Sequence, residues 1–299
     1  MKIAGVVVLY NPDKNVRKNI DSYIDDLDML YVVDNSPEPN DNSKYYKGKK
    51  IKYISNHGNK GIAYALNVGA KEAIKAKNEW LLTMDQDSSF KGDSLSKMIT
   101  FLKEIKNNSF ICETLSISYE KLGILSTLQR TELNRNNEEK GISYPLVVMT
   151  SGNLINLNIY KEVGGFKDWL FIDAVDFDYC LNVRKHRYEI VQMSTAELIH
   201  NLGNVEKHVL LGKTMFATNH NANRRYYITR NRHYLYDLYH SEFEDYCKLE
   251  VGRTKKELIK ILLFEKNKFA KIKAIYMGYR DYKKGIKGEK VWKDTKRKH

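Results

Sequence analysis

Two carboxylates one residue apart mark the first place in this sequence where chemistry could occur. Asp85, Gln86 and Asp87 directly follow a short apolar run. Such a pair can hold Mg²⁺ or Mn²⁺, because these cations prefer oxygen ligands and often share their coordination shell with substrate phosphates. Similar triplets occur in solvated turns, but the position at the end of an apolar run favours a metal site.

A second acidic group lies among apolar and aromatic residues. Asp173, Asp176 and Asp178 all fall within residues 171–180. Apolar surroundings raise the pKa of a carboxyl group and make it a better general base near neutral pH. The alternative is that these residues cap a helix that continues to Arg187, and one could cap while another acts as base. The pattern alone does not decide which of the three is the base.

Several other polar residues are suited to a nucleotide. Asp34 could accept a hydrogen bond from the imide N–H of a pyrimidine, or it could serve only in a turn. Asn59 and Gly61 precede a helix whose first turns carry Asn67, and a helix N-terminus can face phosphate; the alternative is an ordinary cap. His200 follows an apolar run and is either a metal ligand or structural.

These residues require a scaffold, and the sequence predicts an α/β fold with a mostly parallel sheet flanked by helices. Apolar strand-like runs alternate with segments of helical spacing. Ligands of such sheets bind beyond the carboxyl ends of the strands, where the polar residues above fall. Strands are expected at residues 3–10, 29–33, 51–55, 80–84, 122–125 and 146–150, and helices at 16–27 and 61–75.

Composition favours a cytosolic protein. Hydrophobic residues make up 42% of the 299 residues, enough for a large core. The apolar runs are far shorter than the roughly 20 residues that span a bilayer, and the first residues lack the pattern of a signal peptide. Cys112, Cys180 and Cys247 are too far apart for a zinc motif and form no disulfide framework.

Most of the net charge of +13 lies near the C-terminus. Residues 248–299 contain 18 Lys or Arg and 6 Asp or Glu, a net of +12. A basic region indicates an anionic partner, but a nucleic-acid enzyme would more often carry positive charge around its active site as well, so we expect no nucleic acid. We place a boundary near residue 240, between a catalytic domain at 1–240 and a basic helical extension at 241–299.

The extension has the pattern of helices that lie on an anionic membrane surface. Apolar residues recur at helical spacing among lysines, and Glu265 interrupts them, which predicts two helices with a break. The alternative is that the apolar residues pack on the catalytic domain and the lysines are only solvated. The apolar residues are Leu258, Ile261, Leu262, Phe269, Ile272 and Tyr276, and the lysines are Lys255, Lys256, Lys260, Lys266, Lys268, Lys271 and Lys273.

The motifs and their order along the chain resemble those of the family 2 glycosyltransferases with a GT-A fold, and most of all those of the bacterial rhamnosyltransferase branch. The resemblance covers about residues 3–235. It rests on Val6 to Asn11, Val32 to Ser36, Asn59 to Ala63 with Asn67, Met84 to Ser88, Ser151 to Asn153, Gly164 to Phe166, Asp173 to Cys180, His200 to Gly203 and Tyr226 to Asn231.

The resemblance implies a role for each matched residue. Asp87 would bind a metal on the donor diphosphate with help from His200, and Asp176 would be the general base. Asp34 would contact the base of the nucleotide. The residues expected to bind the donor are Tyr10, Asn11, Asp34, Asn59, Gly61, Asn67, Asp85, Gln86 and Gly152.

The implied reaction is an inverting sugar transfer that uses Mg²⁺ or Mn²⁺. The favoured donor is dTDP-β-L-rhamnose, followed by UDP-galactofuranose, UDP-glucose or UDP-galactose. The expected acceptor is a lipid-linked glycan in cell-surface polysaccharide synthesis, which would place the enzyme in the cytoplasm, peripherally at the inner face of the cell membrane.

Two other classes of protein remain as alternatives. A non-catalytic sugar-nucleotide-binding protein would not need Asp176. A nucleotidyltransferase would need a Gly-rich basic signature near the first strand, which residues 4–18 lack. The sequence also has no Gly-x-Gly-x-x-Gly and no Walker P-loop, which argues against a dinucleotide oxidoreductase or an NTPase.

Overall fold

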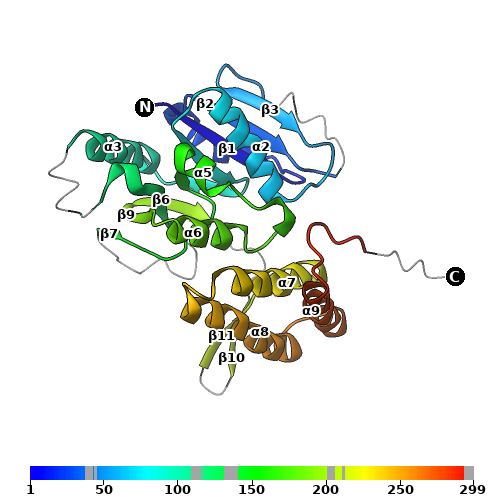
Figure 1. The fold of residues 1–299 in the computed structure, drawn as a ribbon. Coiled ribbons are helices and arrows are strands. Elements are labelled where there is room, and N and C mark those ends of the chain that lie inside the picture. Colours follow the sequence, from blue (N-terminus) through cyan, green and yellow to red (C-terminus); the bar gives the residue numbers. More distant parts are fainter. Residues whose placement is uncertain are drawn as a thin grey trace.

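A mixed β-sheet with flanking helices and a smaller helical lobe form the two parts of the molecule (Figure 1). The computed structural model describes residues 1–37, 43, 46–108, 115, 117–130, 141–200, 206–210 and 213–292, with the side chains of a few of these residues left undescribed.

The first half of the sheet is parallel, as the sequence predicts. Its strands run in the order β3 (Ile51–Ser55), β2 (Met29–Asp34), β1 (Ile3–Leu9) and β4 (Trp80–Asp85). Every residue of β1 is buried, which is the pattern of a strand covered on both faces. Leu9 pairs with Asp34 and Val8 pairs with Asp85, so the carboxyl ends of three neighbouring strands lie side by side.

The second half of the sheet is mixed. β8 pairs antiparallel with both β4 and β6, β9 runs parallel to β6, and the short β5 and β7 pair antiparallel with β9. The bounds are β5 Ser88–Phe90, β6 Leu122–Arg130, β7 Ile142–Ser143, β8 Asn153–Asn156 and β9 Glu189–His200.

The prediction of a strand at residues 146–150 is wrong, because that segment bonds to side chains instead of to a neighbouring strand. The Thr83 hydroxyl donates to the Thr150 carbonyl at 2.6 Å, and the Cys180 thiol contacts both the N–H and the carbonyl of Val148. The strand forms three residues later, after Gly152 turns the chain with a φ of +83°.

Helices cover both faces of the sheet. Alternate residues of β1 enter two cores, one shared with α2, α5 and α6 and the other with α1 and α3. The predicted helix at 16–27 is two pieces, α1 and a 3₁₀ turn at Ile24–Asp26. The helices are α1 Val16–Asp21, α2 Ile62–Lys75, α3 Ser94–Asn107, α5 Leu157–Val163 and α6 Val175–Lys185, with 3₁₀ turns η3 at Tyr119–Lys121 and η4 at Asp168–Leu170.

The helical lobe is built around α7 (Ala222–Tyr239), which packs against both α8 (Glu244–Phe264) and α9 (Lys268–Lys283). A hairpin of β10 (Glu206–Leu210) and β11 (Lys213–Ala217) precedes it. The predicted helix break at Glu265 is confirmed. Because α7 belongs to this lobe, the lobe begins before the boundary expected near residue 240. In the described part of the chain, no helix is both long and apolar enough to cross a membrane.

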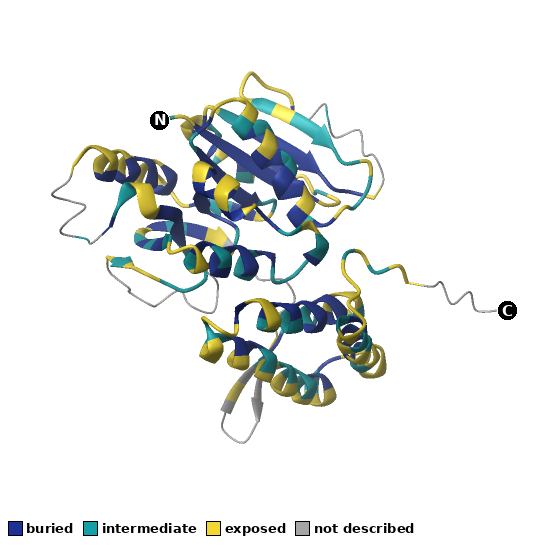
Figure 2. Ribbon diagram, in the orientation of Figure 1, coloured by how far each residue is buried: buried dark blue, intermediate teal, exposed yellow. Residues whose placement is uncertain are grey.

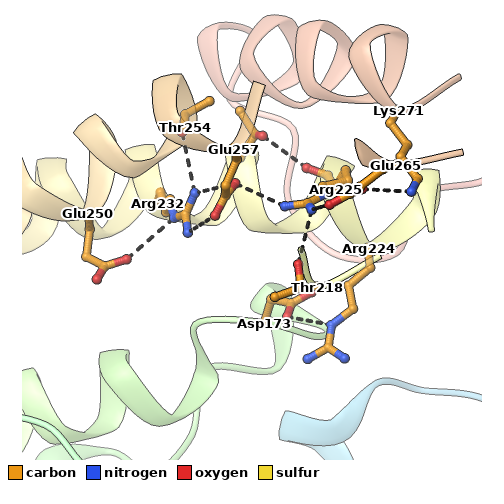
Figure 3. A network of polar contacts seen from close by, with 11 residues as sticks. Asp173, Thr218, Arg224, Arg225, Arg232, Glu250, Thr254, Glu257, Glu265 and Lys271 are labelled. Carbon is orange, nitrogen blue, oxygen red and sulfur yellow. Dashed lines mark hydrogen bonds and ion pairs between the residues drawn. The ribbon is translucent and has the colours of Figure 1, made fainter. Parts of the chain in front are cut away.

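A network of buried charges joins the three helices of the lobe (Figure 3). Arg225 on α7 bonds to Glu265 at 2.8 Å, and Glu265 also accepts from Lys271 of α9 at 2.7 Å. Arg225 and Arg232 both pair with Glu257 of α8. Lys271 is therefore buried against a carboxylate, and it does not belong to a solvated basic face as the sequence suggested.

Candidate active site

The loop after β1 is attached to the ends of β2 and β4. The N–H of Tyr10 donates to the Gln86 side-chain oxygen at 2.8 Å, and the Gln86 amide donates back to the Tyr10 carbonyl at 3.1 Å. The N–H of Asn11 donates to the Ser36 hydroxyl at 2.9 Å. Gln86 and Ser36 thus position the loop, and the ring of Tyr10 is left about half exposed at the edge of the site.

Asp34 lies buried at the end of β2 with both carboxylate oxygens engaged. One oxygen accepts from the N–H of Ser36 at 2.9 Å, and the other accepts from the hydroxyl of Tyr53 on β3 at 2.7 Å. Each carboxylate oxygen has two lone pairs, so Asp34 keeps capacity to accept one more donor such as a pyrimidine imide. Tyr53 was not identified from the sequence, because nothing but strand pairing brings it to Asp34.

Three asparagines form a connected group beside Asp34. The Asn35 amide donates to the Asn59 side-chain oxygen at 3.0 Å, and the Asn56 amide donates to the Asn35 oxygen at 3.1 Å. The Asn59 oxygen also accepts from the N–H of Gly61 at 3.0 Å. Asn59 therefore lies next to Asp34 and Asn35, where a donor-binding residue was expected, and Asn35 and Asn56 join it.

Close packing explains why residue 61, at the edge of the site, is a glycine. Its φ is +88°, and a Cβ there would lie 2.6 Å from the carbonyl oxygen of Phe171. That carbonyl accepts the N–H of Ile62 at 2.7 Å. The Phe171 carbonyl therefore occupies the N–H of Ile62 at the start of α2. From the sequence, this helix N-terminus was a candidate for binding phosphate.

Asn67 does not belong to the donor site. Its amide donates to the carbonyl of Phe166 and the carboxylate of Asp168, and its oxygen accepts from the hydroxyl of Tyr160 and the N–H of Phe166. The side chain is buried, and these four bonds use its hydrogen-bonding capacity inside the core. The prediction that it binds the nucleotide is corrected on this ground.

The acidic edge lies between β4 and β5. Asp85 is partly buried, with its N–H bonded to the Ser151 hydroxyl at 3.0 Å, and Asp87 is exposed. Ser88, next to Asp87, pairs with the backbone of His200. The His200 side chain lies outside the described part of the structure. Gly152 is adjacent to Ser151, and a Cβ on it would lie 2.6 Å from the Thr127 hydroxyl oxygen.

This edge fits a hard divalent cation. Among the residues whose side chains are described, no three His, Cys, Asp or Glu groups converge on one point. Mg²⁺ and Mn²⁺ are often held by only one or two carboxylates, with water and substrate phosphates completing the shell. An exposed Asp87 beside a partly buried Asp85 matches that requirement.

Asp176 stands at the start of α6, partly buried, with its carboxylate accepting from the N–H of Phe177 at 3.0 Å. Burial raises the pKa of Asp176 to about 7, and the nearby charges of Asp173 and Asp85 add to the rise while the Phe177 bond opposes it. Asp85 is therefore close enough for its charge to act on Asp176, which links the acidic edge to a carboxyl group suited to general base catalysis.

The other two carboxylates of this segment have cation partners. Asp178 is fully buried and bonds to Lys167 at 2.9 Å and to the hydroxyl of Tyr239 at 2.8 Å. Asp173 accepts from Arg224 at 2.9 Å. Asp176 is the one of the three with no cation partner among the described residues, which makes it the candidate for a general base.

The mixed α/β sheet, with polar and acidic residues at its strand ends, has the arrangement of a GT-A fold. Solved structures agree on the fold: S. aureus TarS 1-349 in complex with UDP-GlcNAc (TM-score 0.56, 14% identity, 96% of this chain and 82% of that chain) and GalNAc-T7 with UDP, GalNAc and Mn²⁺ (TM-score 0.53, 13% identity, 71% of this chain). The match spans 45% of the GalNAc-T7 chain, less than half its length.

The chain belongs to glycosyl transferase family 2, whose family model matches residues 6–155. A relative of known name is the dTDP-rhamnosyl transferase RfbF of Shigella flexneri, which is 26% identical over 237 residues, 77% of this chain and 78% of that protein. The protein is therefore a glycosyltransferase of family 2.

Proposed function

We propose that the protein is a metal-dependent, inverting glycosyltransferase that moves L-rhamnose from dTDP-β-L-rhamnose to a hydroxyl group of a lipid-linked glycan during synthesis of a cell-surface polysaccharide. The observation that carries the reaction type is Asp176, a partly buried carboxyl group without a cation partner in the described residues, near the acidic edge at Asp85. The choice of donor rests on the similarity to a dTDP-rhamnosyl transferase.

In this reaction Asp176 accepts the proton of the acceptor hydroxyl. The acceptor oxygen attacks the anomeric carbon from the face opposite the nucleotide, and the bond to the diphosphate breaks as the new glycosidic bond forms. No enzyme nucleophile takes part. Asp87, with Asp85 and His200 nearby, would hold Mg²⁺ or Mn²⁺, which when bound supplies positive charge for the leaving diphosphate.

The base of the donor would lie against Asp34. Its carboxylate, fixed by Tyr53 and Ser36, is suited to accept the N3–H of thymine or uracil. A purine presents a different hydrogen-bonding edge and a larger ring system. We therefore expect dTDP and UDP to bind better than GDP and ADP.

A thermal-shift panel of nucleoside diphosphates and sugar nucleotides with Mn²⁺ tests the donor. A ligand at 100 times its Kd stabilises the native state by about 2.7 kcal/mol. dTDP-rhamnose should give a larger shift than UDP-galactofuranose, UDP-glucose or UDP-galactose, and a larger shift for a UDP-sugar would reassign the donor. Release of dTDP on adding acceptor separates a transferase from a sugar-nucleotide-binding protein, which would release none.

The helical lobe would bring the enzyme to the inner face of the cell membrane. On α9, Phe269 is 90% exposed and Tyr276 is 64% exposed, and Leu262 and Leu263 near the end of α8 are about half exposed. Figure 2 shows exposed stretches along both helices. These apolar side chains lie among lysines, a combination that suits anionic lipid, and each basic residue near such a surface contributes about 1 kcal/mol. The opposite side of α9 packs on α7.

Vesicle co-sedimentation tests this localisation. At low salt, the full-length protein should bind vesicles that contain about 30% phosphatidylglycerol, which gives a strongly anionic surface. Added salt should weaken this binding. Point variants are better than truncation, because α9 packs on α7. Leu263→Ser with Phe269→Ser should reduce binding. Tyr144→Ser, which removes an aromatic side chain about as exposed as Leu263 on the α/β part, should not. Absence of binding at low salt would contradict the membrane proposal.

A further inference from the structure

The turn that leads into the catalytic helix has an unfavourable backbone conformation. Phe171, Asp173 and Ala174 have φ values of +67°, +63° and +64°, and none is a glycine. A non-glycine residue in this region costs on the order of 1–2 kcal/mol, so such residues persist only where the surroundings hold them. α6 begins at the next residue, and Asp176 is its second residue.

One side chain from α7 holds three carbonyl groups of this turn. The side-chain amide of Asn231 donates to the carbonyls of Leu170 at 3.0 Å, Ile172 at 2.8 Å and Asp173 at 2.9 Å. Asn231 is fully buried, and its own oxygen accepts from Nε of Arg230 at 3.0 Å. The two amide hydrogens are thus shared among three carbonyls, which fixes the path of the turn.

Arg230, the neighbour of Asn231, links the same segment to the chain beyond α9. Its guanidinium is fully buried and donates to the carbonyl of Leu170 at 3.2 Å and to the carbonyl of Gly288, beyond α9, at 2.6 Å. On the same helix, Arg224 bonds to the carboxylate of Asp173, reaching out of the charge network toward the catalytic part (Figure 3). Arg224, Arg230 and Asn231 of α7 therefore all form hydrogen bonds to the turn or to Leu170 just before it.

The other side of the turn contacts the donor half. The carbonyl of Phe171 accepts the N–H of Ile62 at the start of α2, and Gly61 leaves room for that approach. The ring of Phe171 stacks on Tyr227 of α7, with 5.2 Å between the ring centroids. The turn is thus held between α2, which bonds to the carbonyl of Phe171, and α7, whose side chains bond to the carbonyls of Leu170, Ile172 and Asp173.

We propose that Asn231 is a positioning residue for the transfer reaction: it holds the turn at residues 171–174 in its left-handed conformation and so directs Asp176 into the site. This inference rests on the proposed role of Asp176 as the base. It predicts that Asn231 controls the rate of transfer more than donor binding. Asn231 bonds to none of the donor-side groups, and the Phe171 carbonyl that contacts α2 is not among its partners.

The test compares Asn231→Ala with a matched asparagine on the catalytic helix. Asn182→Ala removes an amide bond to the carbonyl of Val163 but leaves the turn untouched. Misplacing a catalytic group by about 1 Å can cost about 100-fold, so Asn231→Ala should lower kcat about 10- to 100-fold. Donor Kd should stay within about twofold in both variants, and kcat of Asn182→Ala should stay within about twofold of wild type.

A rescue variant distinguishes positioning from general loss of packing. Glycine adopts a positive φ without steric cost, so Ala174→Gly in the Asn231→Ala protein should restore part of kcat. If Asn231→Ala does not fold, Asn231→Ser replaces it in the same comparison. Serine keeps one hydrogen-bond donor and leaves less empty space than alanine. The proposal is contradicted by a folded Asn231 variant with wild-type kcat, by an equal loss in Asn182→Ala, or by no recovery with Ala174→Gly.

Asp176→Asn in the same assay separates this proposal from the function itself. If Asp176→Asn keeps wild-type turnover, the proposed base is wrong and the positioning role falls with it. If Asp176→Asn is inactive but the Asn231 variants turn over normally, the function stands and only the positioning role is refuted.

Discussion

The proposed donor side of the site lies at the ends of parallel strands, whereas the proposed catalytic carboxylate, Asp176, follows a turn whose carbonyls bond to a distant helix. On the donor side, the groups that fix Asp34 come from the same strand end and its neighbour, Ser36 and Tyr53. On the base side, the groups that fix the turn before Asp176 come from α7, about 60 residues further along the chain.

If Asn231 positions the turn before Asp176, the helical lobe takes part in catalysis. Leu235 and Tyr239 of α7 enter the same core as α2 and α6, and α7 is itself held by buried charges from α8 and α9. Substitutions that disturb the lobe should therefore lower kcat, whereas substitutions at the strand ends should weaken donor binding. Four changes test this separation.

The largest effect is expected from Glu265→Ala in the lobe. Removing this buried carboxylate leaves Lys271 as an uncompensated buried charge and takes one of two carboxylate partners from Arg225, and breaking a buried pair costs about 3–5 kcal/mol. Urea unfolding measures the loss. Glu244→Ala is the control, because its pair with Lys248 is exposed and should contribute little to stability. Equal stability of the two variants would show that the network does not hold the lobe.

The next effect concerns the metal edge. Asp87→Ala should remove an oxygen ligand from a cation on the diphosphate and weaken Mn²⁺-dependent donor binding by about tenfold or more. Dialysis against a chelator should have the same effect on the wild-type enzyme. Asp93→Ala is the control, since Asp93 pairs with Lys97 on α3 away from this edge. Full transferase activity in chelator would contradict metal dependence.

The third prediction concerns pH. Since burial raises the pKa of Asp176 to about 7, turnover should rise with pH through about 7 as the base loses its proton. The same group binds a proton more tightly in the folded than in the unfolded state, so its contribution to stability falls as pH rises from about 4 to 7. Asp176→Asn should therefore melt at a higher temperature than wild type at pH 8, and an equal or lower melting temperature would contradict this burial.

The smallest effect is expected from Tyr53→Phe on the donor side. It removes one hydrogen bond to the Asp34 carboxylate, a loss of about 1–2 kcal/mol, so dTDP affinity should fall about 5- to 30-fold while kcat at saturating donor stays near wild type. Isothermal titration and saturation kinetics measure the two quantities. If Tyr53→Phe lowered kcat as much as Asn231→Ala does, the donor side and the base side would not be functionally separate.

The two sides also differ in how far the sequence predicts them. β1 to β4 were predicted within a residue or two, and Asp34 and Asp85 fell at strand ends, because buried parallel strands are continuous apolar runs with polar ends. Asn231 could be matched to a motif, but its three carbonyl partners could not be found, since they depend on tertiary packing. The same reason accounts for Asn67, which helical spacing placed near the nucleotide and the fold placed in the core.

The central claim is that Asp176 is the general base on a donor-binding glycosyltransferase, and one comparison tests it most directly. Donor Kd and kcat for dTDP-rhamnose are measured for wild type and Asp176→Asn at pH 8, where the wild-type carboxyl group is ionised. The amide keeps the shape but accepts no proton, so donor Kd should be unchanged and kcat about 10²- to 10⁴-fold lower. Turnover near that of wild type would contradict the account and place the base elsewhere.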